Sequence, residues 1–136
     1  MAKTDATEQD VLKMLVMGID PSYRSQTNRY IALHTASLTD NSTASTNEAN
    51  YPNYARVAVP TSAWQINANG DLENTQAITF PTAGIGANQT VVAFSITTAA
   101  SGNSQVLYYG DLDVPLQVTQ GIAVTFPPGG LKIREN

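Results

Sequence analysis

The chain has 136 residues, the usual size of a single domain, and combines 42% apolar residues with only 13% charged residues. Its net charge is −4 and its seven lysines and arginines are scattered along the sequence, which disfavours direct binding to nucleic acid. It contains no cysteine, so disulfides, thiolate nucleophiles and zinc sites that need sulfur are excluded.

Uncharged polar side chains must cover most of the surface, because so few residues are charged. A weakly charged exterior suits a surface that lies against neighbouring subunits, although a polar monomer fits the composition equally well. The N-terminal residues lack the basic start and apolar run of a secretory signal, and the apolar stretch at residues 14–17 is far too short to span a bilayer. We therefore expect a protein that is cytoplasmic when it is made and does not enter membranes.

The first predicted element is a helix that begins at Thr4 or Asp5 and ends before Gly18. Either residue can cap the helix, and Glu8 lies in the capping-box position relative to Asp5. Its apolar residues are Val11, Leu12, Met14, Leu15, Val16 and Met17. A lone helix of this length is marginal in water, so its apolar side must dock on something. It either covers the protein's own β domain or acts as an arm that docks on a neighbouring subunit.

From Asn28 onward the apolar residues alternate, with Ile31 and Leu33 on one side, as expected for a half-buried strand. Turn signals such as Asn69-Gly70 separate the short strands that follow. Further strands are predicted at residues 54–59, 64–67, 72–74, 76–80, 90–98, 105–109, 114–119, 122–126 and 131–134. This spacing predicts an all-β fold, an antiparallel β-sandwich or jelly-roll-like arrangement with a short N-terminal α-helix.

The predicted organisation is an N-terminal helix and connecting arm at residues 1–27, followed by a β-sandwich domain at residues 28–136. Alternation also predicts the core of that domain. The in-facing side chains are Ile31, Leu33, Val57, Val59, Trp64, Ile66, Leu72, Ile78, Phe80, Val92, Phe94, Ile96, Val106, Tyr108, Leu116, Val118, Ile122, Val124, Phe126, Leu131 and Ile133.

Residues 40–53 interrupt the strands with a long polar segment. The segment is too polar to bury and too long for a simple turn. We expect it to be either a contact loop or a mobile loop.

Residues that could carry catalysis or bind a metal ion are few. His34 is the only histidine, and no nucleophile elbow accompanies it, so a structural, surface or hydrogen-bonded histidine is favoured over a catalytic one. Asp111 and Asp113 could share a hard cation at a strand end, but the other ligands of a calcium loop are missing. Asp71 and Glu73 lie beside a turn, where both should be solvated. We predict no catalytic residue, no metal site and no cofactor.

Five aromatic residues could include a stacking platform for sugars: Tyr51, Tyr54, Trp64, Tyr108 and Tyr109. Aromatic side chains in strands more often pack in the core or on a sheet. A carbohydrate-binding β-sandwich is therefore kept as an alternative function.

Several stretches occur in an order that resembles a known family. An opening at residues 2–8 and a short helix precede residues 29–36, and a polar loop with Glu48 follows. Residues 54–59, 78–81 and 107–110 then come in turn. This order resembles a widespread group of small tailed-bacteriophage virion proteins, described as tail-fibre-like or uncharacterised, some of which look like capsid decoration (cement) proteins. The resemblance runs over nearly the whole chain and implies no catalytic residues.

The resemblance implies a structural protein of the virion that is made in the host bacterial cytoplasm. The expected role is capsid decoration, in which a homotrimer on the head surface binds the major capsid protein and stabilises the lattice. The candidate subunit-contact residues are Leu12, Met14, Leu15, Tyr51 and Tyr54. The alternative is a tail or tail-fibre component. We predict no enzymatic activity and no nucleic-acid or membrane partner.

Overall fold

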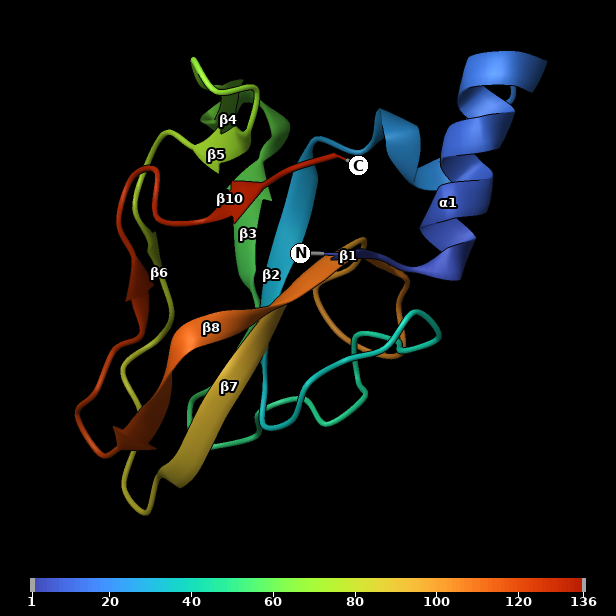
Figure 1. Cartoon of the computed structure of the whole chain (residues 1–136). Coiled ribbons are helices and arrows are strands. Elements are labelled where there is room, and N and C mark those ends of the chain that lie inside the picture. Colours follow the sequence, from blue (N-terminus) through green and yellow to red (C-terminus); the bar gives the residue numbers. More distant parts are fainter. Residues whose placement is uncertain (1, 136) are drawn as a thin grey trace.

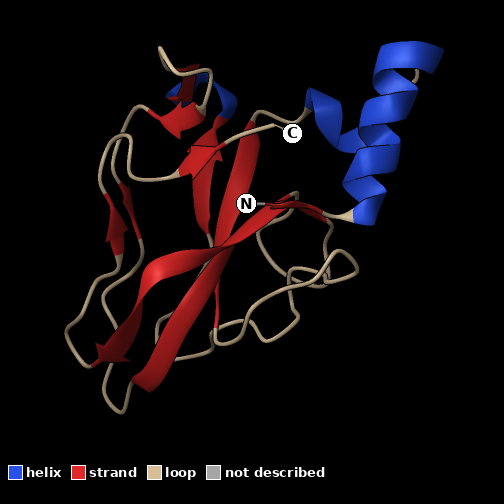
Figure 2. Ribbon diagram, in the orientation of Figure 1, coloured by secondary structure: helices blue, strands red, loops and turns tan. Residues whose placement is uncertain are grey.

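The computed structural model describes residues 2–135, which form mostly antiparallel β-sheet with one helix at the N-terminus (Figures 1 and 2). This composition confirms the predicted mostly-β fold and its N-terminal helix. The strands are β1 (Ala2–Lys3), β2 (Asn28–His34), β3 (Val57–Pro60), β4 (Trp64–Ile66), β5 (Leu72–Asn74), β6 (Ile78–Thr79), β7 (Asn88–Thr97), β8 (Val106–Thr119), β9 (Thr125–Phe126) and β10 (Lys132–Ile133). Helix α1 (Asp5–Leu12) continues as a π-helical turn (Lys13–Met17), and short 3₁₀ turns lie at Ser22–Ser25 and Thr61–Ala63.

The strands are arranged in three sheets. The central sheet has the order β1-β8-β7-β2-β3, and two small sheets have the orders β10-β5-β4 and β6-β9. All pairs are antiparallel. Residues 2–135 show neither a closed barrel nor a jelly roll, so the jelly-roll expectation is not met. Alternation predicted the strands, but it carries no information on which strands pair.

The main core lies between the central sheet and the two small sheets. Phe94 of β7 contacts Phe126 of β9 at 6.0 Å between ring centroids, and Phe80 lies 6.4 Å from Phe126. Ile31 and Leu33 of β2 are fully buried in the same cluster. Side chains from all three sheets therefore exclude water together, which is the main stabilising contribution in a chain without disulfides.

The opposite face of the central sheet is also buried. His34 and Ser95 lie there with no exposed surface, and His34 contacts Thr46 in the loop that follows β2. We expected residues 40–53 to be too polar to bury, but Ala44, Ala49 and Tyr51 of this segment are at most 3% exposed. Backbone hydrogen bonds make this burial possible, such as the 2.8 Å bond from the amide of Ala49 to the carbonyl of Leu33.

Residues 106–119 form one long strand, whereas the sequence predicted two. Val91 of β7 is opposite Leu116, and Ala93 is opposite Asp111, so β8 advances five residues while β7 advances two. The three additional residues form a bulge that contains Pro115, and such a break resembles a strand end in sequence. Because β1 pairs only with Tyr108 and Tyr109, the outer edge of β8 beyond residue 109 has no strand partner among the described residues.

Three residues of the predicted core are exposed instead. Ile66 is 66% exposed, Ile122 is 44% exposed and Leu116 is 39% exposed. In β7, Val91 is fully buried in the main core, whereas alternation had assigned that place to Val92. The register shift between Val91 and Ala93 explains this difference, because a bulge changes the face on which side chains lie.

No helix among the described residues has the length and apolar character needed to cross a membrane.

Candidate functional site

Helix α1 is fixed to the body of the protein by its first turns. Thr4 is the N-cap, and its Oγ1 accepts a hydrogen bond from the amide of Thr7 at 3.4 Å. The hydroxyls of Thr4 and Thr7 both donate to the carbonyl of Val106 in β8. The carboxylate of Asp10 accepts from Gln105 at 3.0 Å and from the hydroxyl of Tyr23 at 2.8 Å. Polar contacts therefore anchor the base of the helix to one end of β8.

The far half of the helix stands clear of the body (Figure 2). Four of its apolar side chains and Ile19, which follows Gly18, are exposed, and we call these five residues the helix patch: Leu12, Leu15, Val16, Met17 and Ile19. Leu15 and Val16 are 79% and 81% exposed. Contiguous exposed apolar residues on a soluble protein mark an interaction surface. The helix ends at Gly18, which has φ 69° as the predicted stop requires.

The predicted contact residues fall in two different environments. Leu12 and Leu15 belong to the helix patch, and Met14 lies beside them, half-buried. Tyr51 is 3% exposed in the main core, and Tyr54 is half-buried against the same core. The fold therefore brings the three helix residues together but separates the two tyrosines from them.

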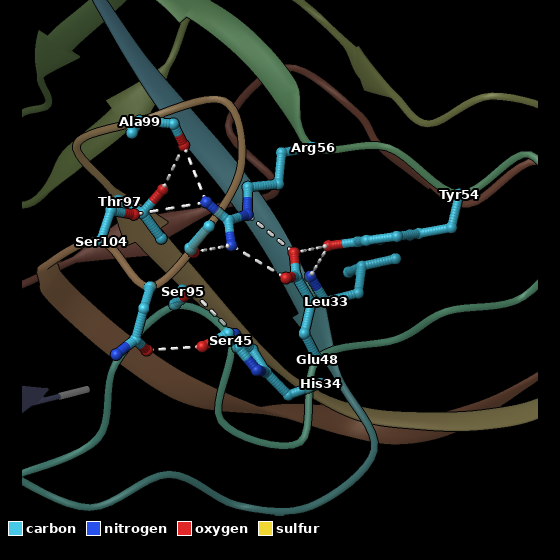
Figure 3. A network of polar contacts seen from close by, with 12 residues as sticks. Leu33, His34, Ser45, Glu48, Tyr54, Arg56, Ser95, Thr97, Ala99 and Ser104 are labelled. Atoms are coloured by element: carbon cyan, nitrogen blue, oxygen red, sulfur yellow. Dashed lines mark hydrogen bonds and ion pairs between the residues drawn. The ribbon is translucent and has the colours of Figure 1, made fainter.

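The hydroxyl of Tyr54 belongs to a polar network around Glu48 and Arg56 (Figure 3). Arg56 donates from Nε to Glu48 Oε2 at 2.7 Å and from Nη2 to Glu48 Oε1 at 2.8 Å, which is a bidentate ion pair. The Tyr54 hydroxyl donates to Glu48 Oε2 at 2.7 Å and accepts from the amide of Leu33. Burial, and then the bond to Glu48, raise the pKa of Tyr54 above its ordinary value. The ion pair is thus tied directly to strand β2.

Arg56 also holds the loop between β7 and β8. Its guanidinium donates to the carbonyls of Ala99 at 3.0 Å and Gly102 at 2.6 Å, and to the hydroxyl of Ser104 at 3.3 Å. The hydrogen bonds to Glu48 raise the pKa of Arg56 further, so its charge is permanent. The Arg56 side chain is 2% exposed and that of Glu48 is 17% exposed. This arrangement joins two loops and a strand, which is a structural role with no catalytic geometry.

His34 fixes part of the loop that follows β2. Its Nδ1 lies 2.9 Å from the carbonyl oxygen of Thr46, and its Nε2 lies 2.8 Å from the hydroxyl of Ser95 (Figure 3). A carbonyl can only accept, so Nδ1 carries the hydrogen, and Nε2 of the neutral ring accepts from Ser95. The histidine is therefore buried and hydrogen-bonded, which confirms the interpretation as a structural residue. It does not lie on the surface of the strand, which was the other position expected for it.

We expect His34 to make the fold sensitive to acid. Burial lowers the pKa of His34 below its ordinary 6.5, against smaller opposing effects of Thr46 and Glu48. Because the unfolded chain then takes up the proton first, this stabilisation is complete above pH 6.5 and is lost as the pH falls through the folded-state pKa. When thermal unfolding is measured from neutral to mildly acidic pH, the melting temperature should fall less for His34→Gln than for the unmodified chain. An equal loss in both proteins would contradict this role.

The predicted carboxylate pairs do not form metal sites. Asp111 and Asp113 are both exposed beside the β8 bulge. Asp71 forms an ion pair with Arg134 at 2.6 Å, and this guanidinium lowers the pKa of Asp71. Hydrogen bonds from neighbouring amide side chains likewise lower the pKa of Glu73. Among residues 2–135 no group of three or more histidine or carboxylate side chains could hold a metal ion.

The five aromatic residues pack as the favoured interpretation predicted, and the alternative, a stacking platform, is not assembled. Tyr51 and Tyr54 face the main core, and their rings meet edge to face at 5.3 Å. Trp64 and Tyr108 pack against that core from different strands, while Tyr109 lies with the small cluster on the other face. These five rings are used for packing, and they do not share one exposed surface.

A groove of about 530 Å³, which the sequence does not reveal, lies along the bulged part of β8. We call it the β8 groove, and its apolar lining consists of Phe94, Leu112, Val114, Leu116, Phe126 and Leu131. Asp111, Asp113 and Lys132 also line it. The groove lies where the bulge interrupts the regular pairing of β8 with β7. The sequence did not predict this groove, because its lining combines residues 110–116 and 126–132 and depends on the register shift between β7 and β8.

Comparison with known proteins gives one family. A family model described as podophage GP4 fiber I protein gp80 matches residues 2–134. No curated protein matches the sequence. The match includes the helix, every strand and both surfaces described above, so it extends over nearly the whole chain.

Proposed function

We propose that this chain, which belongs to the family of the podophage GP4 fiber I protein gp80, is a subunit of a phage tail fibre. Family membership makes it a structural protein of the bacteriophage virion, and it implies a non-enzymatic role. Capsid decoration, the first expectation from the sequence, has no support in this family. The tail-fibre alternative is favoured in its place.

The observation that supports a role in assembly is the helix patch. Leu15 and Val16 expose most of their surface, although a soluble monomer gains stability by covering such side chains. The helix is anchored at Thr4 and Thr7, so the patch is held at a defined distance from the body. A fixed apolar projection of this kind is suited to docking on another subunit of the fibre.

The position of the chain in the virion tests this proposal. Antibody labelling in electron microscopy is expected to mark the tail, and quantitative mass spectrometry is expected to give far less than one copy per major capsid subunit. A ratio near one, with label over the head, would instead indicate a capsid coat. Absence from purified particles would also reject the proposal.

A further inference from the structure

The chain carries two exposed apolar surfaces on opposite sides. The helix patch projects from one side, and the β8 groove lies on the other, along β8 and the segment between β9 and β10 (Figure 1). The hydrogen bonds from the helical segment to β8 end on Val106 at the beginning of that strand, whereas the groove is lined by residues 110–116 of β8. The two surfaces therefore cannot meet within one molecule.

We propose that copies of this chain associate head to tail, with the helix patch of one copy seated in the β8 groove of the next. This inference rests on the proposed function and deepens it, because it names a second copy of the chain as the partner. Two different surfaces that complement each other make a heterologous contact, which closes into a ring or continues as a filament.

The size of the two surfaces supports this pairing. The five side chains of the helix patch expose on the order of 500 Å², a large part of the roughly 800 Å² that one partner contributes to a standard interface. The groove, with about 530 Å³, has room for several side chains. Its rim adds exposed apolar surface of its own, since Val114 is 67% exposed and Leu116 is 39% exposed.

The charges of the two surfaces are also complementary. Lys13 is exposed on the helix next to Leu12, and it forms no ion pair within the part of the chain that the structure describes. Asp111 and Asp113 line the groove together with a single lysine, Lys132, so the groove is acidic on balance. A lysine that enters such a groove gains a carboxylate partner, which favours one orientation of docking.

Cysteine cross-linking tests the contact directly, because the chain has no cysteine of its own. Leu15→Cys and Val114→Cys each place one thiol on one surface, and both positions are exposed, so the fold should persist. The two purified variants are treated with a short thiol-specific cross-linker, separately and as a mixture. We expect dimer well above background in the mixture only. A double variant should give a ladder of oligomers or a closed ring.

The controls separate this contact from other kinds of association. Ile66→Cys exposes a thiol to a similar degree on β4, and its mixture with Leu15→Cys should give no cross-linked dimer above background. Cross-linking of Leu15→Cys with itself would indicate a symmetric helix-to-helix dimer and overturn the proposal. A chain that stays monomeric in sedimentation and in the mixture would overturn it as well. If the chain is found in the tail but does not cross-link in the mixture, only the head-to-tail contact fails.

Discussion

Replacing Arg56 with methionine is expected to lower the free energy of unfolding by about 3–5 kcal/mol, because it leaves a buried carboxylate without its partner. The carboxylate of Glu48 would then lack its cation in a site where its side chain is only 17% exposed. The carbonyls of Ala99 and Gly102 would lose their donors at the same time. Such a loss is a large part of the roughly 5–15 kcal/mol that stabilises a typical domain.

Chemical denaturation measures this effect, and a second arginine provides the control. Arg134 forms an ion pair with Asp71 at 2.6 Å, but its side chain is 60% exposed. Arg134→Met should therefore change the denaturation midpoint little. Replacing Arg56 and Glu48 together by apolar residues should recover part of the loss, because no charge is then left buried. If Arg56→Met is as stable as Arg134→Met, the network does not have the structural importance that we assign to it.

The second large effect is expected on assembly. Leu15→Asp should weaken docking of the helix patch by about 30-fold or more, the effect of a loss near 2 kcal/mol at an interface hot spot. The stability of the isolated chain should hardly change, because Leu15 is already 79% exposed. Incorporation is measured by mass spectrometry of particles from a phage that carries the substitution.

Ile66→Asp is the matched control for this prediction. Ile66 is also apolar and 66% exposed, but it lies on β4, away from the helix. Normal incorporation of Ile66→Asp together with loss of Leu15→Asp would assign assembly to the helix patch. Normal incorporation of both variants would show that another surface attaches the chain.

Local signals predicted the helix and most strands well. Thr4 and Gly18 mark the ends of the helical segment because capping depends on neighbouring residues alone. One detail differs from the expected capping box, in which Glu8 was paired with Asp5. Because Thr4 is the N-cap, the third helical position is Thr7, and Glu8 lies one place beyond it. Strand β5 has the predicted bounds because a turn precedes it.

Features that depend on distant pairing were not predicted. The alternation in β7 and β8 assumed regular strands, so the register shift near Val91 and the bulge around Pro115 were both missed. The partners of Glu48 in space include Arg56, whose other bonds reach Ala99 and Gly102 more than forty residues away. A single arginine within an apolar strand and a single glutamate in a polar loop were the available signals. They showed two unusual residues but not that these residues pair.

The bulge on β8 also protects the open edge of that strand. An open strand edge exposes a row of unpaired backbone groups, which can recruit further strands without limit and lead to amyloid-like aggregates. Beyond residue 109, β8 is such an edge, but three additional residues and a proline without an amide hydrogen interrupt the row. The bulge therefore disfavours edge-to-edge pairing of β8 with strands of other chains.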